Sequence, residues 1–598
     1  MQRRALVSLL VLLAFITSPT FLHAQFQEPT KEELQMTTDP KAPGAAAVYL
    51  YREETTDDQL HFHSYYERIK VLTEKGKEQA TIRIPYERGE FKVTDIKGRT
   101  IHSDGTVIPL STKPADLIDT KTNNRQINQM VFTLPSVEVG SILEYRLQIR
   151  YDDNLVSSPS WDIQQPFFVH KAHYAFNPAR TGGSYITNGR GQNLDRIMWT
   201  TIGVPTETVI HQPTGHYTVD VSDVPALSTD DWMPPLNTIK WRVEFYYTYA
   251  HSGVDFWDSE GKRWAKDAEH FTYPSGQLKS AVSQMIAPTD SDEQKARKIY
   301  ATVVKLENTR FTRRKSEAER KAEKLKVIKD AEDVWKRQSG SDDEITLLYV
   351  ALARAAGLKV WPMQVTDRSR AIFDPRFMSI SQLDDYIAIV ELGGKEVYVD
   401  PGQKMCPFGT LSWKHALASG FRLSDKGPAL ATTPPETYKN AVTQRIADLT
   451  IDPTGAVNGS VRFVMNGLDA IYWRQLTLEN DQEEVKKQFN ESMQHEFPDG
   501  VQADFDHFLG LDNYEANLVG IIKITGNIAT ATGKHFFLPG LFFESRAQHS
   551  FVAQDKRATP VDVRYPKIEQ DDVVYHLPPG FNVESAQKPP MLLGLTMH

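Results

Sequence analysis

The chain has 598 residues, of which 40% are hydrophobic and 24% charged, and its formal net charge is −9. This length predicts several domains, and the composition is typical of globular proteins that bury sizeable cores. The negative charge argues against a nucleic-acid-binding protein, which would present a basic surface, and a single cysteine excludes an intrachain disulfide.

The N-terminus has the order of a secretory signal. Positive charge in "MQRR" is followed by the apolar run "ALVSLLVLLAFI" and by "FLHA" before Gln25. This order predicts a signal peptide over residues 1–24 and an exported mature chain, periplasmic or secreted. The apolar run is too short for a convincing span, and no later stretch reaches ~18 apolar residues, so no transmembrane segment is expected after cleavage. An uncleaved anchor is the alternative.

The region after the signal is predicted to be a flexible lead-in followed by an all-β domain. Residues 25–47 are polar and contain prolines, which is typical of flexible segments. Residues 48–250 alternate or run in strand-sized blocks such as "VYLYREETT" and "SILEYRLQIRYD". The Asp-Gly pair in "HSDGTVIPL" favours a hairpin. We therefore expect an N-terminal β-sandwich-like domain.

Two further domains follow. Residues 251–440 begin with helical spacing, including a capping box of Ser291 with Gln294, and continue into strands such as "DDYIAIVELGG", which predicts an α+β domain. The mixed-charge segment 313–338 is typical of a solvated helix face. Residues 441–598 return to strand patterns around a polar helical insert at 470–497, so the C-terminal domain is predicted to be β-rich.

One stretch of the α+β domain has the frame of an active site. In "QSGSDDEITLLYVALARAAGLKVWPMQV", Ser341 and Glu344 can form a capping box at the start of a helix. One face of that helix is predicted to be buried, and it carries Ile345, Leu348, Tyr349 and Leu352. A helix start would activate a cysteine, whereas a serine there needs a strong base as partner.

This stretch, followed by "QLDDYIAIVELGGKEVYVDPG", resembles the core of bacterial transglutaminase-like domains, a papain-related cysteine fold. The resemblance places the family's cysteine at Ser341, its histidine at Asp385 and its aspartate at Asp400. Two of three catalytic positions are therefore replaced. The segments "SDGTVIPL", "FTLPSVEVGSILEYRLQIRYDD" and "DVPALSTDDWMPP" resemble the uncharacterised β module that commonly precedes such domains in exported bacterial proteins. Together the resemblance spans residues 48–415.

The replaced positions predict a degenerate, non-catalytic site. Asp385 would be ionised and a feeble base toward a serine hydroxyl, and members of a triad act as a unit. The resemblance then implies a groove that binds a peptide, protein or cell-wall ligand, and no cofactor is expected. The candidate groove residues are Ser341, Asp342, Asp384, Asp385 and Asp400. Two alternatives stay open: a residual hydrolase or acyltransferase that uses Cys406 or another nucleophile, and an envelope-associated scaffold.

Cys406 is the one thiol that such an enzyme could use. It follows Asp400 by six residues in a turn-rich loop, and His415 lies nearby on an expected short helix, "LSWKHALASG". A Cys406–His415 pair is therefore an alternative. We favour a partly buried, inert thiol, because the position neither starts a helix nor has a convincing base.

No metal site is predicted. Acidic side chains including Asp342, Asp343 and Asp385 would offer Ca²⁺ oxygen ligands if they converged, but the first two are explained by the positive end of the helix dipole. Two histidine pairs, His61 with His63 and His170 with His173, would each need two further ligands to bind zinc. The oligomeric state is left open.

Overall fold

The protein is described here from a computed structural model. It covers residues 26–121, 126–153, 155–179, 194, 196–205, 208, 210–212, 215–312, 327–532, 535–539, 541–543 and 557–584. The chain is strand-rich and divides into two compact units. The first comprises residues 1–188, 204–227 and 241–245, and the second comprises residues 189–203, 228–240 and 246–598. The predicted signal peptide lies outside the described residues, and the predicted domain boundaries stay predictions.

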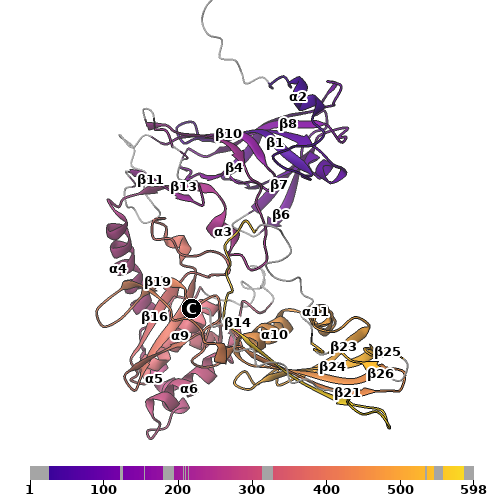
Figure 1. The fold of residues 1–598 in the computed structure, drawn as a ribbon. Coiled ribbons are helices and arrows are strands. Elements are labelled where there is room, and N and C mark those ends of the chain that lie inside the picture. Colours follow the sequence, from indigo (N-terminus) through magenta and orange to yellow (C-terminus); the bar gives the residue numbers. More distant parts are fainter. Residues whose placement is uncertain are drawn as a thin grey trace, which may run out of the picture. The chain divides into compact units, whose positions relative to one another are not determined.

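The first unit is built on a seven-stranded sheet in the order β12-β10-β1-β2-β8-β4-β5. Figure 1 labels β10, β1, β8 and β4 of this sheet. Its strands pair antiparallel, apart from the parallel pair of β1 with β10. A three-stranded sheet has the order β3-β7-β6, and β9 pairs with β13. The bounds are β1 Ala47–Asp57, β2 Phe62–Val71, β3 Thr81–Glu87, β4 Phe91–Ile101, β5 Val107–Pro109, β6 Ala115–Lys121, β7 Gln126–Thr133, β8 Ile142–Tyr151, β9 Ser160–Asp162, β10 Val169–Asn177, β12 Tyr217–Val224 and β13 Arg242–Thr248.

The predicted hairpin at Asp104–Gly105 is confirmed. Strands β4 and β5 pair antiparallel on either side of it, with Ile101 opposite Val107. Gly105 has a φ of +88°, a conformation that glycine adopts without the steric cost of a Cβ.

The prediction of a flexible lead-in is wrong for part of residues 25–47. The short helix α2 (Lys31–Gln35) begins with a capping box of Thr30 and Glu33. Arg68 of β2 contacts Glu33 at 3.1 Å, and the ammonium of Lys70 donates to the carbonyl of Leu34 at 3.0 Å. Both cationic side chains are buried, and buried charges require partners. The lead-in supplies some of these partners, together with Glu144 and the carbonyl of Gly140, and sequence composition alone does not indicate this.

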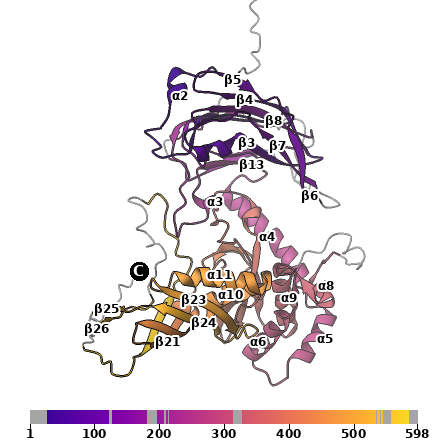
Figure 2. The ribbon, with the colours of Figure 1, turned by 90° about the vertical axis from the view of Figure 1, so that its right-hand side faces the viewer.

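The second unit contains an antiparallel sheet in the order β18-β17-β16-β19-β20. Helices cover it, and Figure 2 shows α5, α6 and α8 around α9. The capping box of Ser291 with Gln294 forms at the start of α6, as predicted. The bounds are β11 Arg196–Ile202, α3 Leu236–Ile239, α4 Gly253–Phe271, α5 Gly276–Met285, α6 Asp292–Val303, β14 Glu307–Asn308, α8 Ala331–Arg337, β15 Ser339–Gly340, α9 Asp342–Ala355, β16 Val360–Val365, β17 Asp385–Leu392, β18 Lys395–Val399, β19 Ser419–Arg422 and β20 Ala429–Thr432.

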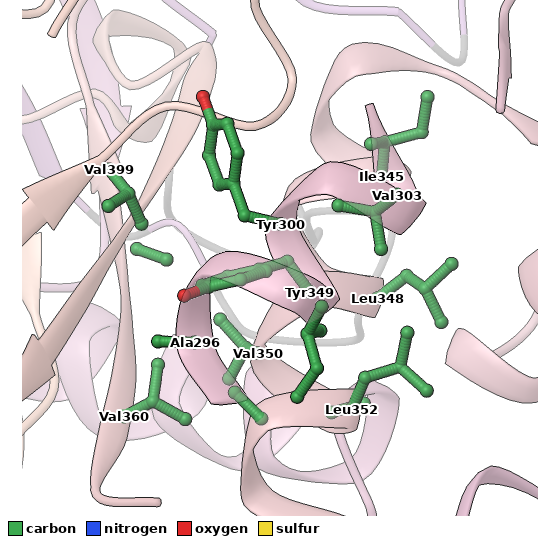
Figure 3. Close-up of a cluster of buried hydrophobic side chains, with 14 of the residues drawn as sticks. Ala296, Tyr300, Val303, Ile345, Leu348, Tyr349, Val350, Leu352, Val360 and Val399 are labelled. Carbon is green, nitrogen blue, oxygen red and sulfur yellow. The ribbon is translucent and has the colours of Figure 1, made fainter. Parts of the chain in front are cut away.

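Helix α9 is the centre of this domain. The predicted face of Ile345, Leu348, Tyr349 and Leu352 is buried, but so is every residue from 345 to 353. The helix packs against β16 and β17 on one side and against α5, α6 and α8 on others. Figure 3 shows this core, a buried cluster to which Tyr300, Tyr349 and Val399 belong. A helix that is buried on all sides is typical of such a central position. Because Ser341 is the N-cap of α9, the packing of the helix also fixes the position of Ser341.

The C-terminal part of the second unit forms a separate sheet in the order β23-β24-β22-β21-β27. The predicted helical insert is present as α10 and α11, whose Trp473 and Phe489 join the sheet's own apolar core. Among the described residues, no helix is both long and apolar enough to cross a membrane. The bounds are β21 Val442–Ile451, β22 Ala456–Met465, α10 Gly467–Glu479, α11 Gln482–Gln494, β23 Val501–Leu509, β24 Leu518–Asn527, β25 Thr530–Thr532, β26 His535–Phe537 and β27 Ile568–His576.

Candidate functional site

Ser341 is the N-cap of α9, as predicted. Its hydroxyl accepts from the backbone N–H of Glu344 at 3.2 Å, and its own N–H donates to Oε2 of Glu344 at 2.8 Å. Both bonds belong to the capping box. The hydroxyl is therefore engaged with its own helix, and its hydrogen-bond partner is not a general base.

Asp385 and Asp400 come together in space, and a histidine joins them. Asp385 opens β17, and Asp400 directly follows β18. Between them lies His415, whose Nδ1 is 2.7 Å from Oδ2 of Asp400 and whose Nε2 is 2.7 Å from Oδ2 of Asp385. The side chain of His415 is 1% exposed, that of Asp400 0% and that of Asp385 14%. The sequence placed the two aspartates at one site but assigned no such role to His415.

The bridge holds His415 in its charged form. Burial disfavours an imidazolium, but the charge of Asp400 and the hydrogen bonds from both aspartates outweigh that cost and raise the pKa of His415 to about 9. Burial also disfavours the Asp385 carboxylate, yet the bonds and charges of His415 and Lys414 hold the pKa of Asp385 well below its usual range. At neutral pH both ring nitrogens therefore carry protons and donate to carboxylates.

A second buried cation, Lys414, joins His415, Asp385 and Asp400, and these four residues form the centre of the site. The ammonium of Lys414 lies 2.6 Å from Oδ2 of Asp385 and 3.1 Å from Oδ2 of Asp367. Burial favours the neutral amine, but Asp385 and Asp367 more than compensate and raise the pKa of Lys414. Asp385 thus bonds to two cations, and the negative charge predicted at this position is largely neutralised.

Three further acidic residues surround the centre. Oδ1 of Asp343 accepts from the N–H of Tyr386 at 3.0 Å, while burial and the charges of Asp342 and Asp385 raise the pKa of Asp343 to about 7. Oδ2 of Asp342 is 3.7 Å from the guanidinium of Arg310. Asp384 accepts from the N–H of Asp367 at 2.8 Å. Asp343 was not among the groove residues predicted from sequence, although it lies directly beside Asp385.

Neither His415 nor Asp385 is placed to act as a general base in this arrangement. A general base needs a free lone pair, and His415 has both ring nitrogens bonded to carboxylates. Asp385, with its lowered pKa, is a weaker base than an ordinary aspartate. The bridge of His415 with Asp385 and Asp400 fixes charges in place beside the start of α9.

The short helix expected over "LSWKHALASG" is absent, and this correction explains the bridge. Residues 413–417 form turns, and Leu417 has a φ of +54° that interrupts helical geometry. The N–H of Ser412 donates to Asp400 at 3.0 Å, and the guanidinium of Arg368 donates to the carbonyl of Ala416 at 2.7 Å. These bonds hold the loop in the conformation that points Lys414 and His415 at the aspartates. The one sequence signal for the bridge was the adjacent pair Lys414 and His415 in an apolar segment.

Cys406 does not pair with His415. Its side chain is 0% exposed, and its Sγ donates to the carbonyl of Thr410 at 3.3 Å. Burial, followed by the charges of Asp400, Glu436 and Glu515, raises the pKa of the thiol well above its usual range. The thiol packs in an apolar cluster with Ala441, Leu468 and Ile471, which is the environment of an inert cysteine.

Each histidine of the two pairs bonds to a neighbouring group of its own. His63 bonds Thr56 at 2.9 Å and Ser157 at 3.1 Å, His170 bonds Asp39 at 2.5 Å, and His173 bonds Asp220 at 2.8 Å. His61 bonds the carbonyl of Leu155 at 3.1 Å. In the part of the chain that the structure describes, no group of three or more His, Cys, Asp or Glu side chains is arranged to hold a metal ion.

Comparison with known proteins bears on part of the chain. Residues 57–226 match a family described as a domain of unknown function with a solved structure (DUF3857). No curated protein matches. A crystal structure from Parabacteroides distasonis, described as a candidate protease, is similar at 12% identity and TM-score 0.44, with 83% of this chain and 94% of that chain covered. A candidate cysteine protease from Cytophaga hutchinsonii is similar at 10% identity and TM-score 0.16, over 54% and 80%.

The family match agrees with the uncharacterised β module expected in this part of the sequence. It covers the first unit mainly and does not include the site around His415. At their identities and TM-scores, the two structural likenesses carry no argument about what this chain does.

Proposed function

We propose that the protein is an exported, non-catalytic transglutaminase-like protein that binds a peptide, protein or cell-wall ligand. The observation that supports this most directly is the His415 bridge, because carboxylates bond both ring nitrogens of this imidazole and leave it no free lone pair with which to act as a base. Export rests on the N-terminal sequence alone.

The binding surface in this proposal is the rim at the start of α9. Ser341, Asp342 and Asp343 are partly exposed there, and Asp384 has a side chain that is 20% exposed. Asp385 and Asp400 are more deeply buried and act as supports that fix the rim. The carboxylates of this rim favour ligands that carry an amine, since the opposite charge offsets the desolvation of both partners. Such an amine would compete with Arg310, 3.7 Å from Asp342, and with Arg370, 2.5 Å from Asp384.

The test measures binding and turnover in one experiment. The full chain is incubated with purified peptidoglycan sacculi and with their soluble stem peptides, and bound protein and cleaved or newly linked products are quantified. We expect retention without products. The informative variant is Asp342→Asn, at the first position of α9. Its matched control is Asp292→Asn, at the same position of α6, whose side chain is 65% exposed.

Each outcome separates the candidates. Retention that falls for Asp342→Asn but not for Asp292→Asn supports binding at the rim. Products that disappear with Cys406→Ser would support the residual-enzyme alternative instead. Absence of both retention and products would overturn the cell-wall form of the proposal.

A further inference from the structure

A pocket in the second unit lies beside α4 and is separate from the groove residues. Its volume is about 640 Å³, and its wall is mostly apolar. The residues that matter for its chemistry are Met198, Val254, Trp257, Met378, Phe421 and Leu430. None of them belongs to the acidic rim or to the His415 bridge.

The floor of the pocket is fixed, whereas its mouth is open. Trp257 is 6% exposed and Phe421 1%, and the indole N–H of Trp257 donates to the carbonyl of Pro375 at 2.8 Å. At the mouth, Val254 is 83% exposed and Leu430 40%. A preformed aromatic floor with exposed apolar rims is typical of a site that receives an apolar group.

The pocket adjoins a free sheet edge. Strand β20 stands at the end of the order β18-β17-β16-β19-β20, and within the part of the chain that the structure describes it pairs only with β19. Figure 1 shows α4 next to β19. An unpaired strand edge presents backbone N–H and C=O groups that can bind another strand.

The register decides which groups of β20 face outward. Within β19 the carbonyl of Ser419 accepts from Thr366 at 3.1 Å, so residues with odd numbers bond toward β16. Those with even numbers therefore bond toward β20, where Gly420 lies opposite Ala431 and Arg422 opposite Ala429.

Leu430 and Thr432 consequently direct their N–H and C=O groups away from the sheet. Among the described residues, neither main chain makes a hydrogen bond on that side. Leu430 both lines the pocket and belongs to the free edge, so the two features meet at one residue.

We propose that an extended peptide segment of a partner protein pairs with β20 as a sixth strand and inserts an apolar side chain into the pocket. Backbone pairing would supply affinity, and the pocket would select the side chain, as in other cases of strand addition. A lipid acyl chain would fill the pocket but leave the polar edge groups of Leu430 and Thr432 without partners. This site goes beyond the proposed function and does not rest on it.

The test selects a random nine-residue peptide library, displayed on phage, against the full chain. Affinities of the enriched peptides are then measured for three variants. Thr432→Pro removes one outward backbone donor and leaves the backbone bonds to β19 in place. Its matched control, Thr432→Val, keeps that donor, and both variants lose the same side-chain hydrogen bond to Ser419 of β19 at 2.8 Å. Val254→Glu places a charge at the pocket mouth, where the side chain is 83% exposed and the fold should tolerate it.

We expect the enriched peptides to share one apolar position and to bind about tenfold more weakly to Thr432→Pro and to Val254→Glu, with Thr432→Val unchanged. Loss with Val254→Glu alone would show that the pocket binds an apolar group without strand pairing and would overturn the proposal. A library without enriched binders, or binders unaffected by all three changes, would also overturn it.

Discussion

Nε2 of His415 and Oδ2 of Asp385 lie 2.7 Å apart. Asp385 occupies the position at which the resemblance to transglutaminase-like domains places a histidine. An imidazole is therefore present at this site, but it comes from the loop after β18, and Asp400 binds its other nitrogen. His415 and the two aspartates thus form an array of opposite charges, and the predictions below test that array.

The first prediction concerns the bridge itself. His415→Ala should lower the free energy of unfolding by about 3–5 kcal/mol, because it leaves Asp385 and Asp400 buried without that cation. Calorimetry of the full chain, following the transition of the second unit, measures the loss. The control is His173→Ala at the exposed His173–Asp220 pair, which should cost less than about 1 kcal/mol. Similar losses for both variants would contradict the buried-charge explanation.

The second prediction is the pH dependence that follows from the same bridge. Because the fold raises the pKa of His415 from 6.5 to about 9, its stabilisation is complete below pH 6.5 and disappears as the pH rises through 9. Asp385 has the opposite sign, since its lowered pKa gives stability that is lost only on acidification below its ordinary value of 3.8. Unfolding midpoints between pH 7 and 9.5 should fall for the natural chain and stay nearly constant for His415→Gln. Parallel curves would exclude His415 as the titrating group.

Asp343 offers a stabilising substitution. Its pKa is raised to about 7, chiefly by burial and by Asp342, so the carboxylate is charged and unfavourable above that pH. Asp343→Asn keeps an oxygen to accept from Tyr386 but removes the charge. We expect it to add on the order of 1–2 kcal/mol of stability at pH 8 and less at pH 5. A gain of equal size at both pH values would argue for packing rather than charge.

Ser341, the N-cap of α9, is expected to contribute to the stability of the fold. Ser341→Ala should cost ~1 kcal/mol, because the third backbone N–H of the helix loses its acceptor, whereas Ser341→Asn keeps an acceptor and should be nearly neutral. Thermal melts of the two variants provide the comparison. A large loss for Ser341→Asn would mean that the hydroxyl has a partner outside the cap.

Cys406 should be unreactive in the folded protein. Iodoacetamide at pH 8 is expected to label it only after denaturant is added, since the side chain is 0% exposed and its pKa is raised well above the usual range. Labelling is quantified by mass spectrometry at increasing urea concentrations. Fast labelling without urea, combined with a functional defect of Cys406→Ser, would revive the enzyme alternative.

Features that depend on neighbouring residues could be predicted from the sequence. The capping boxes at Ser341 and Ser291, the Asp104–Gly105 hairpin and the helices of the 470–497 insert all form as expected. Each is decided within a few residues, by a side chain that bonds a nearby backbone group or by the period of apolar residues.

The identity of the residue between Asp385 and Asp400 was decided only by the tertiary structure. His415 follows them by 30 and 15 residues, and local propensity favoured a helix that would have turned it elsewhere. The loop instead takes the path that neutralises carboxylates buried by the sheet, because leaving them without cations costs more than one turn of helix contributes. The lead-in follows the same rule, since Arg68 and Lys70 bind its residues. Thus the sequence determined the local elements and the positions of the acidic side chains, and the burial of charge decided their partners.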